Sequence, residues 1–301
     1  MKKFLAAILI AAFLLAFPVQ ARAAGEPVVS ADACVLMEAG TGEVLLEKNA
    51  DAQMLIASTT KIMTALVVLD HENLDEEVTI RPEWTNIEGS SMYLAAGQSY
   101  TVRELLYGMM LASGNDAAVA LACHTAGSVD AFAALMNAEA ASLGCTNTHF
   151  ENPNGLDSAG HYSSARDLAV ITRKAIRNEN FCSIVSCKSI TIGSNTFSNH
   201  NRLLRECEGV FGVKTGYTEA AGRSLVTCCE REGMTLICVT LSDPDDWDDH
   251  ATLYDWAYGT YTTADVLPEA NVYDMPVIGG EAPSVPIKPE GNLCLLRCKD
   301  A

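Results

Sequence analysis

The chain has 301 residues, of which 49% are hydrophobic, and it carries 20 Lys and Arg against 38 Asp and Glu, a net charge of −18. This length and apolar content allow a large buried core and exclude an intrinsically disordered chain. The acidic balance argues against nucleic acid as a partner, because a surface that binds nucleic acid must be basic to replace phosphate counterions. It argues equally against binding to anionic lipid.

The first residues have the pattern of a secretory signal. Lys2 and Lys3 precede an uninterrupted apolar run from residue 4 to 17, and Ala21-Arg22-Ala23 follows as a cleavage-like site. The run is too short to span a bilayer comfortably. We therefore expect residues 1–23 to be a signal peptide and the protein to work outside the cytoplasm, at the outer face of the cytoplasmic membrane or in the cell wall. An uncleaved anchor is the alternative.

The cysteines favour buried thiols over disulfides or a metal site. There are 11, an odd number that cannot pair fully, and the chain contains no Cys-x-x-Cys. Several lie within apolar runs, as at Cys123 and Cys238, where cysteine serves as a small buried hydrophobic residue. We expect most of the thiols to be reduced.

The predicted elements begin with two short strands and continue as helices. Strand-like runs at 33–38 and 44–48 flank a turn at 39–42, and the apolar run 62–69 predicts a helix buried on all sides. Thr101 with Glu104 forms a capping-box pattern before a helix to residue 111. Further helices are expected from Ser128 to near Gly144, and from Ser164 to about residue 177.

The second half of the domain returns to strands. Runs rich in β-formers at 210–214, 224–229 and 234–241 precede an expected helix at 248–258. Strands, a block of helices, then strands and a helix indicate an α+β fold with an antiparallel sheet. Strand-like runs follow at 271–278, 283–288 and 292–297, but residues 268–301 are too few to bury a core of their own.

The first motif whose residues could take part in a reaction is Ser58-x-x-Lys61. At the start of a helix this spacing places both side chains on one face, roughly 5–6 Å apart at Cβ. A serine hydroxyl needs a neighbouring base to become a nucleophile. Lysine is such a base only when burial or a nearby cation lowers its pKa. Chance alone supplies roughly one such motif in a chain of this length, from average residue usage.

Two further motifs follow the first. Ser113-Gly114-Asn115 offers a hydroxyl and an amide, although it also fits an ordinary turn at the end of a helix. Lys214-Thr215-Gly216 places an ammonium beside a hydroxyl, an arrangement that suits a carboxylate ligand. Its glycine lets a substrate backbone approach the strand. Its alternative is a plain exit from a strand into a turn.

The three motifs in this order resemble the penicillin-recognising serine enzymes. The segments 57–65, 89–92, 152–156 and 212–218 look like those of the D-alanyl-D-alanine carboxypeptidases of peptidase family S11, the DacF-like branch. The resemblance covers roughly residues 28–262. It implies a β-lactamase/transpeptidase-like fold, an antiparallel sheet packed with a helical cluster. The implied domains are a catalytic domain at 24–262 and a linker with a partial β-rich segment at 263–301.

The resemblance also implies a role for each motif residue. Ser58 is then the acyl-ester nucleophile and Lys61 its proton acceptor. Ser113 passes a proton toward the leaving D-alanine, and Asn115 holds substrate or supports Lys61. The substrate is bound by Lys214, Thr215, Gly216 and Tyr217, the first two at its terminal carboxylate, with an oxyanion hole from the backbone N–H groups of Ser58 and Tyr217. No metal or cofactor is implied.

The partners implied are a peptidoglycan stem peptide ending in D-Ala-D-Ala and β-lactams as covalent inhibitors. Many relatives continue into a complete β-rich domain and an anchoring helix, whereas this chain stops at Ala301, so membrane attachment stays open. A β-lactamase and a non-catalytic penicillin-binding sensor are the alternatives. The first commonly has S-D-N where this chain has Ser113-Gly114-Asn115, and a sensor needs no Lys61 base.

The acidic run 243–249 and the histidines at 149 and 161 do not have the pattern of a metal site. Some relatives place an arginine after the K-T-G strand, whereas the corresponding run 243–249 here is acidic and contains no basic residue. We expect this run to be a solvated turn before the last helix, because it lacks the alternating pattern of a calcium loop. His149 and His161 lack metal-ligand spacing and are expected to be surface or hydrogen-bonded loop residues.

Overall fold

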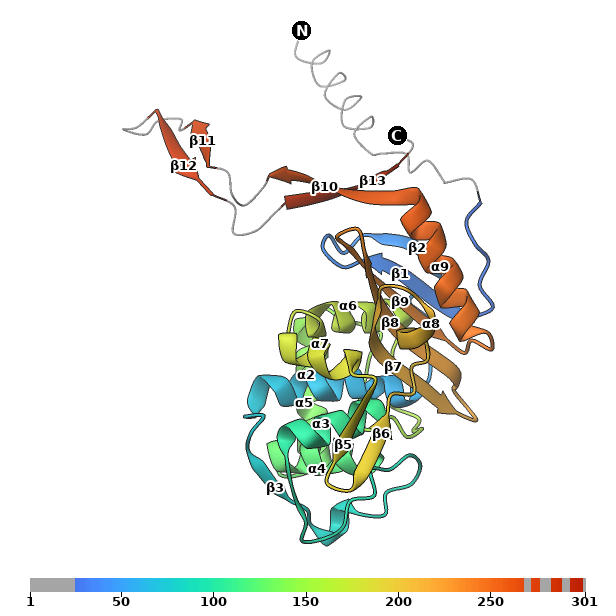
Figure 1. The fold of residues 1–301 in the computed structure, drawn as a ribbon, viewed down its shortest axis with the longest axis vertical. Coiled ribbons are helices and arrows are strands. Elements are labelled where there is room, and N and C mark those ends of the chain that lie inside the picture. Colours follow the sequence, from blue (N-terminus) through green and yellow to red (C-terminus); the bar gives the residue numbers. More distant parts are fainter. Residues whose placement is uncertain (1–24, 268–271, 277–282, 289–292, 300–301) are drawn as a thin grey trace, which may run out of the picture.

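The structure is a computed structural model that describes residues 25–267, 272–276, 283–288 and 293–299. The predicted signal peptide lies outside the described residues. Figure 1 shows a sheet with helices on both of its faces, followed by an extended C-terminal segment. This arrangement confirms the α+β prediction.

The central sheet has five antiparallel strands in the order β2-β1-β9-β8-β7. The strands predicted near 33–38, 44–48, 210–214, 224–229 and 234–241 are all present, and two of them are longer than predicted. Their bounds are β1 Ala33–Glu38, β2 Val44–Lys48, β7 Val210–Thr218, β8 Gly222–Arg231 and β9 Met234–Leu241. The first and last parts of the domain therefore pair at the centre of the sheet, and β7 is left as an edge strand.

Helices cover both faces of this sheet. Six lie on one face, and α9 packs on the other (Figure 1). The bounds are α2 Lys61–His71, α3 Val102–Leu111, α4 Asn115–Ala126, α5 Val129–Ser142, α6 Ala165–Ala175, α7 Glu179–Ser186, the short α8 Leu203–Glu206, and α9 Asp246–Thr260. Side chains of β1 alternate between the two cores, Val35 toward the helical cluster and Leu36 toward α9. All six residues of this strand are buried for that reason.

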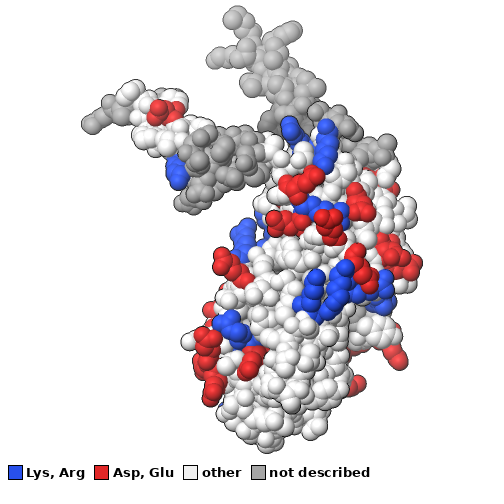
Figure 2. Space-filling view, viewed as in Figure 1, with Lys and Arg blue, Asp and Glu red and all other residues white. Residues whose placement is uncertain are grey.

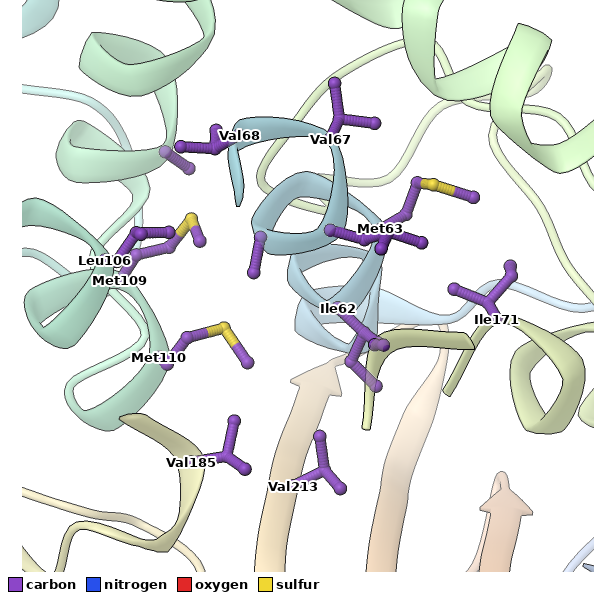
Figure 3. Packing of buried hydrophobic residues seen from close by; sticks show 14 of the residues in the cluster. Ile62, Met63, Val67, Val68, Leu106, Met109, Met110, Ile171, Val185 and Val213 are labelled. Carbon is purple, nitrogen blue, oxygen red and sulfur yellow. The ribbon is translucent and has the colours of Figure 1, made fainter. Parts of the chain in front are cut away.

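The larger core surrounds α2, as the apolar run 62–69 predicted. Ile62, Met63 and Val67 of this helix point toward side chains from several neighbouring elements (Figure 3). The labelled partners are Leu106, Met109 and Met110 of α3, Ile171 of α6, Val185 of α7 and Val213 of β7. A helix enclosed in this way holds its first residue, Lys61, in a fixed and water-poor position.

The predicted helix starts are confirmed by their caps. Thr101 and Glu104 form a complete capping box, and the side chains of Ser128 and Ser164 accept hydrogen bonds from backbone N–H groups in the first turns of α5 and α6. The sequence analysis missed α4. Its N-cap is Gly114, which offers no side-chain acceptor, so the start of this helix is not marked by a capping residue.

Short hairpins complete the structure. They pair β3 Glu77–Thr79 with β4 Ser99–Thr101, β5 Ser189–Ile192 with β6 Asn195–Ser198, β10 Tyr261–Leu267 with β13 Leu293–Cys298, and β11 Tyr273–Pro276 with β12 Ser284–Ile287. A 3-10 turn, η2, spans Pro82–Trp84. The strands expected after residue 268 are thus present where the structure describes them, and the sequence analysis missed β10. The domain boundary at 262 stays a prediction.

The described cysteines are free thiols, and the face of the molecule seen in Figure 2 is mixed in charge. On the face seen in Figure 2, acidic and basic side chains are interspersed, and the part over β5 and β6 is mostly uncharged. The ten cysteines whose side chains are described form no disulfide, and five of them are buried.

In the described part of the chain no single helix is long and apolar enough to cross a membrane. The pair α4 and α5, bent by 84°, meets the length and composition criteria only when the two helices are taken together.

Candidate active site

Ser58 and Lys61 meet at the start of α2. Ser58 belongs to a 3-10 turn, η1 (Ala57–Thr60), and Lys61 is the first residue of the helix that follows. Residues three apart on a 3-10 turn lie on the same side. Lys61 Nζ donates a hydrogen bond to Ser58 Oγ over 2.9 Å, so the predicted shared face is confirmed.

Two further acceptors hold the ammonium of Lys61 in place. Nζ donates to Asn115 Oδ1 at 2.7 Å and to the backbone carbonyl of Asn154 at 2.6 Å. The amide of Asn115 is itself oriented by a hydrogen bond from Nδ2 to the carbonyl of Glu88, 2.6 Å away. Lys61 is fully buried. The structure therefore brings together residues from three distant segments around one nitrogen.

The surroundings of Lys61 favour its neutral form. Burial is the largest influence and lowers the pKa of its ammonium well below the ordinary value, and the nearby cation Lys214 lowers it further. The carboxylate of Asp116 acts in the opposite direction and raises this pKa. Burial also lowers the pKa of Lys214, to about 7. A lysine whose pKa is lowered by burial and a neighbouring cation can serve as a base toward the Ser58 hydroxyl.

The Ser113-Gly114-Asn115 motif forms the connection between α3 and α4. Ser113 is buried and has a left-handed backbone, φ +59°. A Cβ at Gly114 would lie 3.0 Å from Asp116 Oδ1 and 3.1 Å from the backbone nitrogen of Met92. This turn is therefore closely packed against the loop that contains Met92, and it presents Ser113 to the same pocket as Ser58.

The Lys214-Thr215-Gly216 motif lies on the edge strand β7. Lys214 is buried, and its Nζ donates to the carbonyl of Thr215 at 2.8 Å. A Cβ at Gly216 would come within 3.2 Å of the Ser58 backbone nitrogen. The absence of a side chain therefore allows this strand to approach the turn that carries Ser58 closely.

A surface pocket joins these elements. Five of the predicted site residues line it, namely Ser58, Ser113, Thr215, Gly216 and Tyr217. The other three, Lys61, Asn115 and Lys214, are buried. The sequence analysis missed the remaining lining residues, which are Ser90, His200, Arg223, Asp246 and Trp247. The arrangement is a cleft with a serine–lysine pair on one side and the edge of a strand on the other.

Comparison with known proteins decides the family. Residues 20–245 match the Peptidase_S11 family, described as D-alanyl-D-alanine carboxypeptidase. The chain belongs to this family. It is 35% identical to the D-alanyl-D-alanine carboxypeptidase DacF of Bacillus subtilis, across 87% of this chain and 72% of that protein. It is 37% identical to DacC of Escherichia coli, across 91% of this chain and 74% of that protein.

Solved structures of this family share the fold. Penicillin-binding protein 5 from Haemophilus influenzae superposes with a TM-score of 0.84 at 32% identity, across 91% of this chain and 84% of that one. A point mutant of the Streptomyces K15 DD-transpeptidase gives a TM-score of 0.75 at 36% identity, across 77% of this chain and 99% of that one. The resemblance stated from the motifs and the fold that it implies are thus confirmed.

In this S11 family member, Asp116 organises the loop beside the serine–lysine pair. Its buried carboxylate accepts hydrogen bonds from the Met92 and Leu94 backbone nitrogens at 2.8 and 3.0 Å and from Ser91 Oγ at 2.7 Å. These partners lie more than 20 residues away in sequence, so no local pattern predicts the contacts. The only indication in the sequence is that Asp116 is adjacent to Asn115. With a fourth from the Ala117 backbone nitrogen at 2.9 Å, these hydrogen bonds compensate the cost of burying the charge.

His161 contacts the turn η1, which carries Ser58, through Thr60. It is buried, its Nε2 lies 2.8 Å from Thr60 Oγ1, and its Nδ1 accepts a hydrogen bond from the Glu151 backbone nitrogen at 3.1 Å. Burial lowers the pKa of its imidazole to about 4, so the ring is neutral at physiological pH. His149 Nδ1 lies 2.6 Å from the Gly160 carbonyl oxygen. Both residues are therefore hydrogen-bonded loop histidines, as expected, but His161 lies in the interior.

The turn that supplies the Asn154 carbonyl depends on a glycine. Gly155 has φ +85°, and its nitrogen donates to Asn152 Oδ1 at 2.7 Å, which closes the turn. A Cβ at this position would lie only 1.9 Å from the carbonyl oxygen of Ala57, the residue before Ser58. The turn is therefore packed directly against the backbone of the segment that carries Ser58.

We expect Gly155→Ala to destabilise the protein by about 3 kcal/mol or more, because a backbone overlap is added to an unfavourable φ. Acylation of Ser58 by a penicillin should slow in the same variant, since the turn must move. Gly144→Ala is the matched control, with φ +77° and no atom within 4 Å of the added Cβ. Urea unfolding and the acylation rate measure both effects. Equal behaviour of the two variants would contradict the packed turn.

The acidic run 243–249 corrects one prediction. Asp243 and Asp246 are buried rather than solvated. Asp243 Oδ1 accepts a hydrogen bond from Ser30 Oγ, and Asp246 Oδ1 accepts one from Nη2 of Arg223 at 2.5 Å. The run contains no basic residue itself, but it holds an arginine that reaches the pocket from β8. Sequence alone gave no indication of this pairing.

Proposed function

We propose that this chain is a serine D-alanyl-D-alanine carboxypeptidase that removes the terminal D-alanine from peptidoglycan stem peptides through an acyl-enzyme on Ser58. The observation that carries the proposal is the contact of Lys61 Nζ with Ser58 Oγ at 2.9 Å, with Lys61 buried and its pKa lowered. The names of the S11 relatives support the choice of reaction. β-Lactams would acylate the same serine and act as inhibitors.

In the proposed reaction, neutral Lys61 takes the proton from Ser58 as Oγ attacks the carbonyl carbon of the penultimate D-alanine. The negative charge on the carbonyl oxygen is stabilised by the backbone N–H groups of Ser58 and Tyr217. The C–N bond to the terminal D-alanine then breaks, and the leaving amine takes up the proton that Lys61 accepted, relayed through Ser113, so that Lys61 is neutral again. Water attacks the resulting ester, Lys61 accepts its proton, and Ser58 is released.

The substrate lies along β7 in this proposal. Lys214 and Thr215 bind the terminal carboxylate, and Gly216 leaves room for the peptide backbone. Asn115 holds Lys61 through its side-chain oxygen, as its 2.7 Å hydrogen bond supports. These eight residues are proposed to be the working site, with three of them buried behind the pocket.

The test is release of D-alanine from the model substrate diacetyl-L-Lys-D-Ala-D-Ala. We expect the wild type to release one D-alanine per peptide and Ser58→Ala to release none. Ser142→Ala, at an exposed serine, is the control and should be as active as the wild type. Hydrolysis of penicillin without D-alanine release would support a β-lactamase. A stable penicillin adduct without peptidase activity would support a sensor.

We further propose that residues 1–23 are a signal peptide and that the protein acts outside the cytoplasm. The support is the Lys2-Lys3 start, the apolar run and the small residues at 21–23. Sequencing the N-terminus of the protein recovered from its cells tests this. A start at Ala24 is expected, and a retained Met1 would contradict cleavage.

A further inference from the structure

Glu72, Glu76 and His124 form a cluster of side chains outside the pocket. Glu72 is the C-cap of α2, Glu76 lies in the loop just before β3, and His124 lies in the last turn of α4. His124 Nε2 is 3.6 Å from Glu72 Oε2 and 3.3 Å from Glu76 Oε1. One nitrogen or oxygen of each residue lies within 4.8 Å of the other two. Three different segments therefore bring possible metal ligands to one point.

The separations in this cluster match a metal site better than hydrogen bonds. Both contacts of His124 Nε2 are longer than about 2.7–3.2 Å, the usual range of an N–H···O hydrogen bond. A tetrahedral zinc ion binds imidazole nitrogen and carboxylate oxygen at about 2.0–2.2 Å, so its ligand atoms lie about 3.3–3.6 Å from one another. The two separations fall in this range.

The charge around the cluster favours a cation. Two carboxylates face one imidazole, and in the part of the chain that the structure describes no lysine or arginine forms an ion pair with either of them. Arg103 pairs instead with Asp75 of the same loop, at 3.1 Å. The C-terminal ends of α2 and α4 add partial negative charges. A neutral imidazole leaves this charge uncompensated, whereas a divalent cation would neutralise it.

Backbone hydrogen bonds hold both glutamates in position. The Glu72 nitrogen donates to the Val68 carbonyl at 2.9 Å, and the Glu76 carbonyl accepts from the Val102 nitrogen of α3 at 2.9 Å. The side chains of Glu72 and His124 are only 13% and 21% exposed, whereas that of Glu76 is 49% exposed. An ion would thus have two sheltered ligands and one side open to water.

We propose that Glu72, Glu76 and His124 bind one Zn²⁺, with a water molecule as the fourth ligand. One imidazole and two carboxylates suit zinc, whereas calcium and magnesium take about six or more oxygen ligands. The helices α2 and α4 begin at Lys61 and Asn115, and a rise of about 1.5 Å per residue puts the zinc roughly 15 Å from their hydrogen bond. The ion is therefore structural and ties the far ends of these helices to the β3–β4 hairpin. This inference does not depend on the proposed carboxypeptidase reaction.

The test is zinc binding by the full chain after removal of metal with a chelator. Isothermal titration calorimetry with Zn²⁺ should show one site per chain, and the melting temperature should rise with zinc concentration because the folded state binds the ion. In Glu72→Gln and His124→Ala we expect the affinity to fall by about 10²-fold or more, because even an outer partner of a ligand is worth about 10–100-fold. With cobalt(II) in place of zinc, the spectrum should lack thiolate charge-transfer absorption.

Asp75→Asn is the matched control, because it removes the same charge from the same loop at a side chain that is 80% exposed and outside the cluster. It should bind zinc as the wild type does, and circular dichroism verifies that each variant is folded. A wild type that binds no zinc, or equal affinities in Glu72→Gln and Asp75→Asn, would overturn the inference and leave the contacts of His124 as ion pairs only. Thiolate absorption with cobalt(II) would overturn it as well, by placing the metal on cysteine.

Discussion

Replacing Lys61 with arginine is expected to slow the acylation of Ser58 by about 10²–10⁴-fold, the usual contribution of a general base. The positive charge would remain, but a guanidinium does not give up its proton and cannot accept one from the serine. The rate is measured by following the benzylpenicillin adduct with intact-protein mass spectrometry. The conservative control is Lys174→Arg, at an exposed position on α6, which should acylate at the wild-type rate.

A Lys61→Arg variant that acylates near the wild-type rate would identify Lys61 as a structural cation. The proton of Ser58 would then have to leave through Ser113, which lines the same pocket. The hydrogen bonds of Lys61 to Asn115 and Asn154 would in that case serve only to hold the two loops.

Removing Lys214 should have two separable consequences. Lys214→Ala is expected to weaken capture of a free C-terminal carboxylate, raising KM for the peptide by about 10²-fold or more, as for loss of one partner of a buried charge pair. It should also raise the pKa of Lys61, because the nearby cation that lowers it is gone. Since the proposed acylation requires neutral Lys61, its pH profile should move to higher pH.

Acylation rates of Lys214→Ala across the pH range check the second consequence, and KM values check the first. Lys174→Ala, remote from the pocket, should change neither. A profile that stays in place or moves to lower pH would show that Lys214 does not act on the Lys61 charge.

The sequence predicted the parts of the site that depend on local spacing. Ser58 and Lys61 are three residues apart, so one turn decides their contact. The caps at Thr101, Ser128 and Ser164 are equally local, and the structure confirms them. The assembly of the three motifs around one pocket depends on long-range packing, and it followed from the resemblance to the S11 family rather than from the spacing.

The residues that the sequence analysis missed act through distant partners. Asp116 binds a loop more than 20 residues before it, and Arg223 of β8 meets Asp246 at the start of α9. The prediction of a solvated run at 243–249 was wrong for Asp243 and Asp246, because it relied on the usual exposure of aspartate. A buried carboxylate becomes acceptable once a cation or hydrogen-bond donors surround it, and sequence alone does not reveal those partners.

The most direct test of the account is to locate the penicilloyl group after reaction with benzylpenicillin. One added group is expected, on the peptide that contains Ser58, and it should be absent in Ser58→Ala. Mapping uses proteolysis and tandem mass spectrometry of the full chain. A group attached at another residue, or its persistence in Ser58→Ala, would contradict the assignment of Ser58 as the nucleophile.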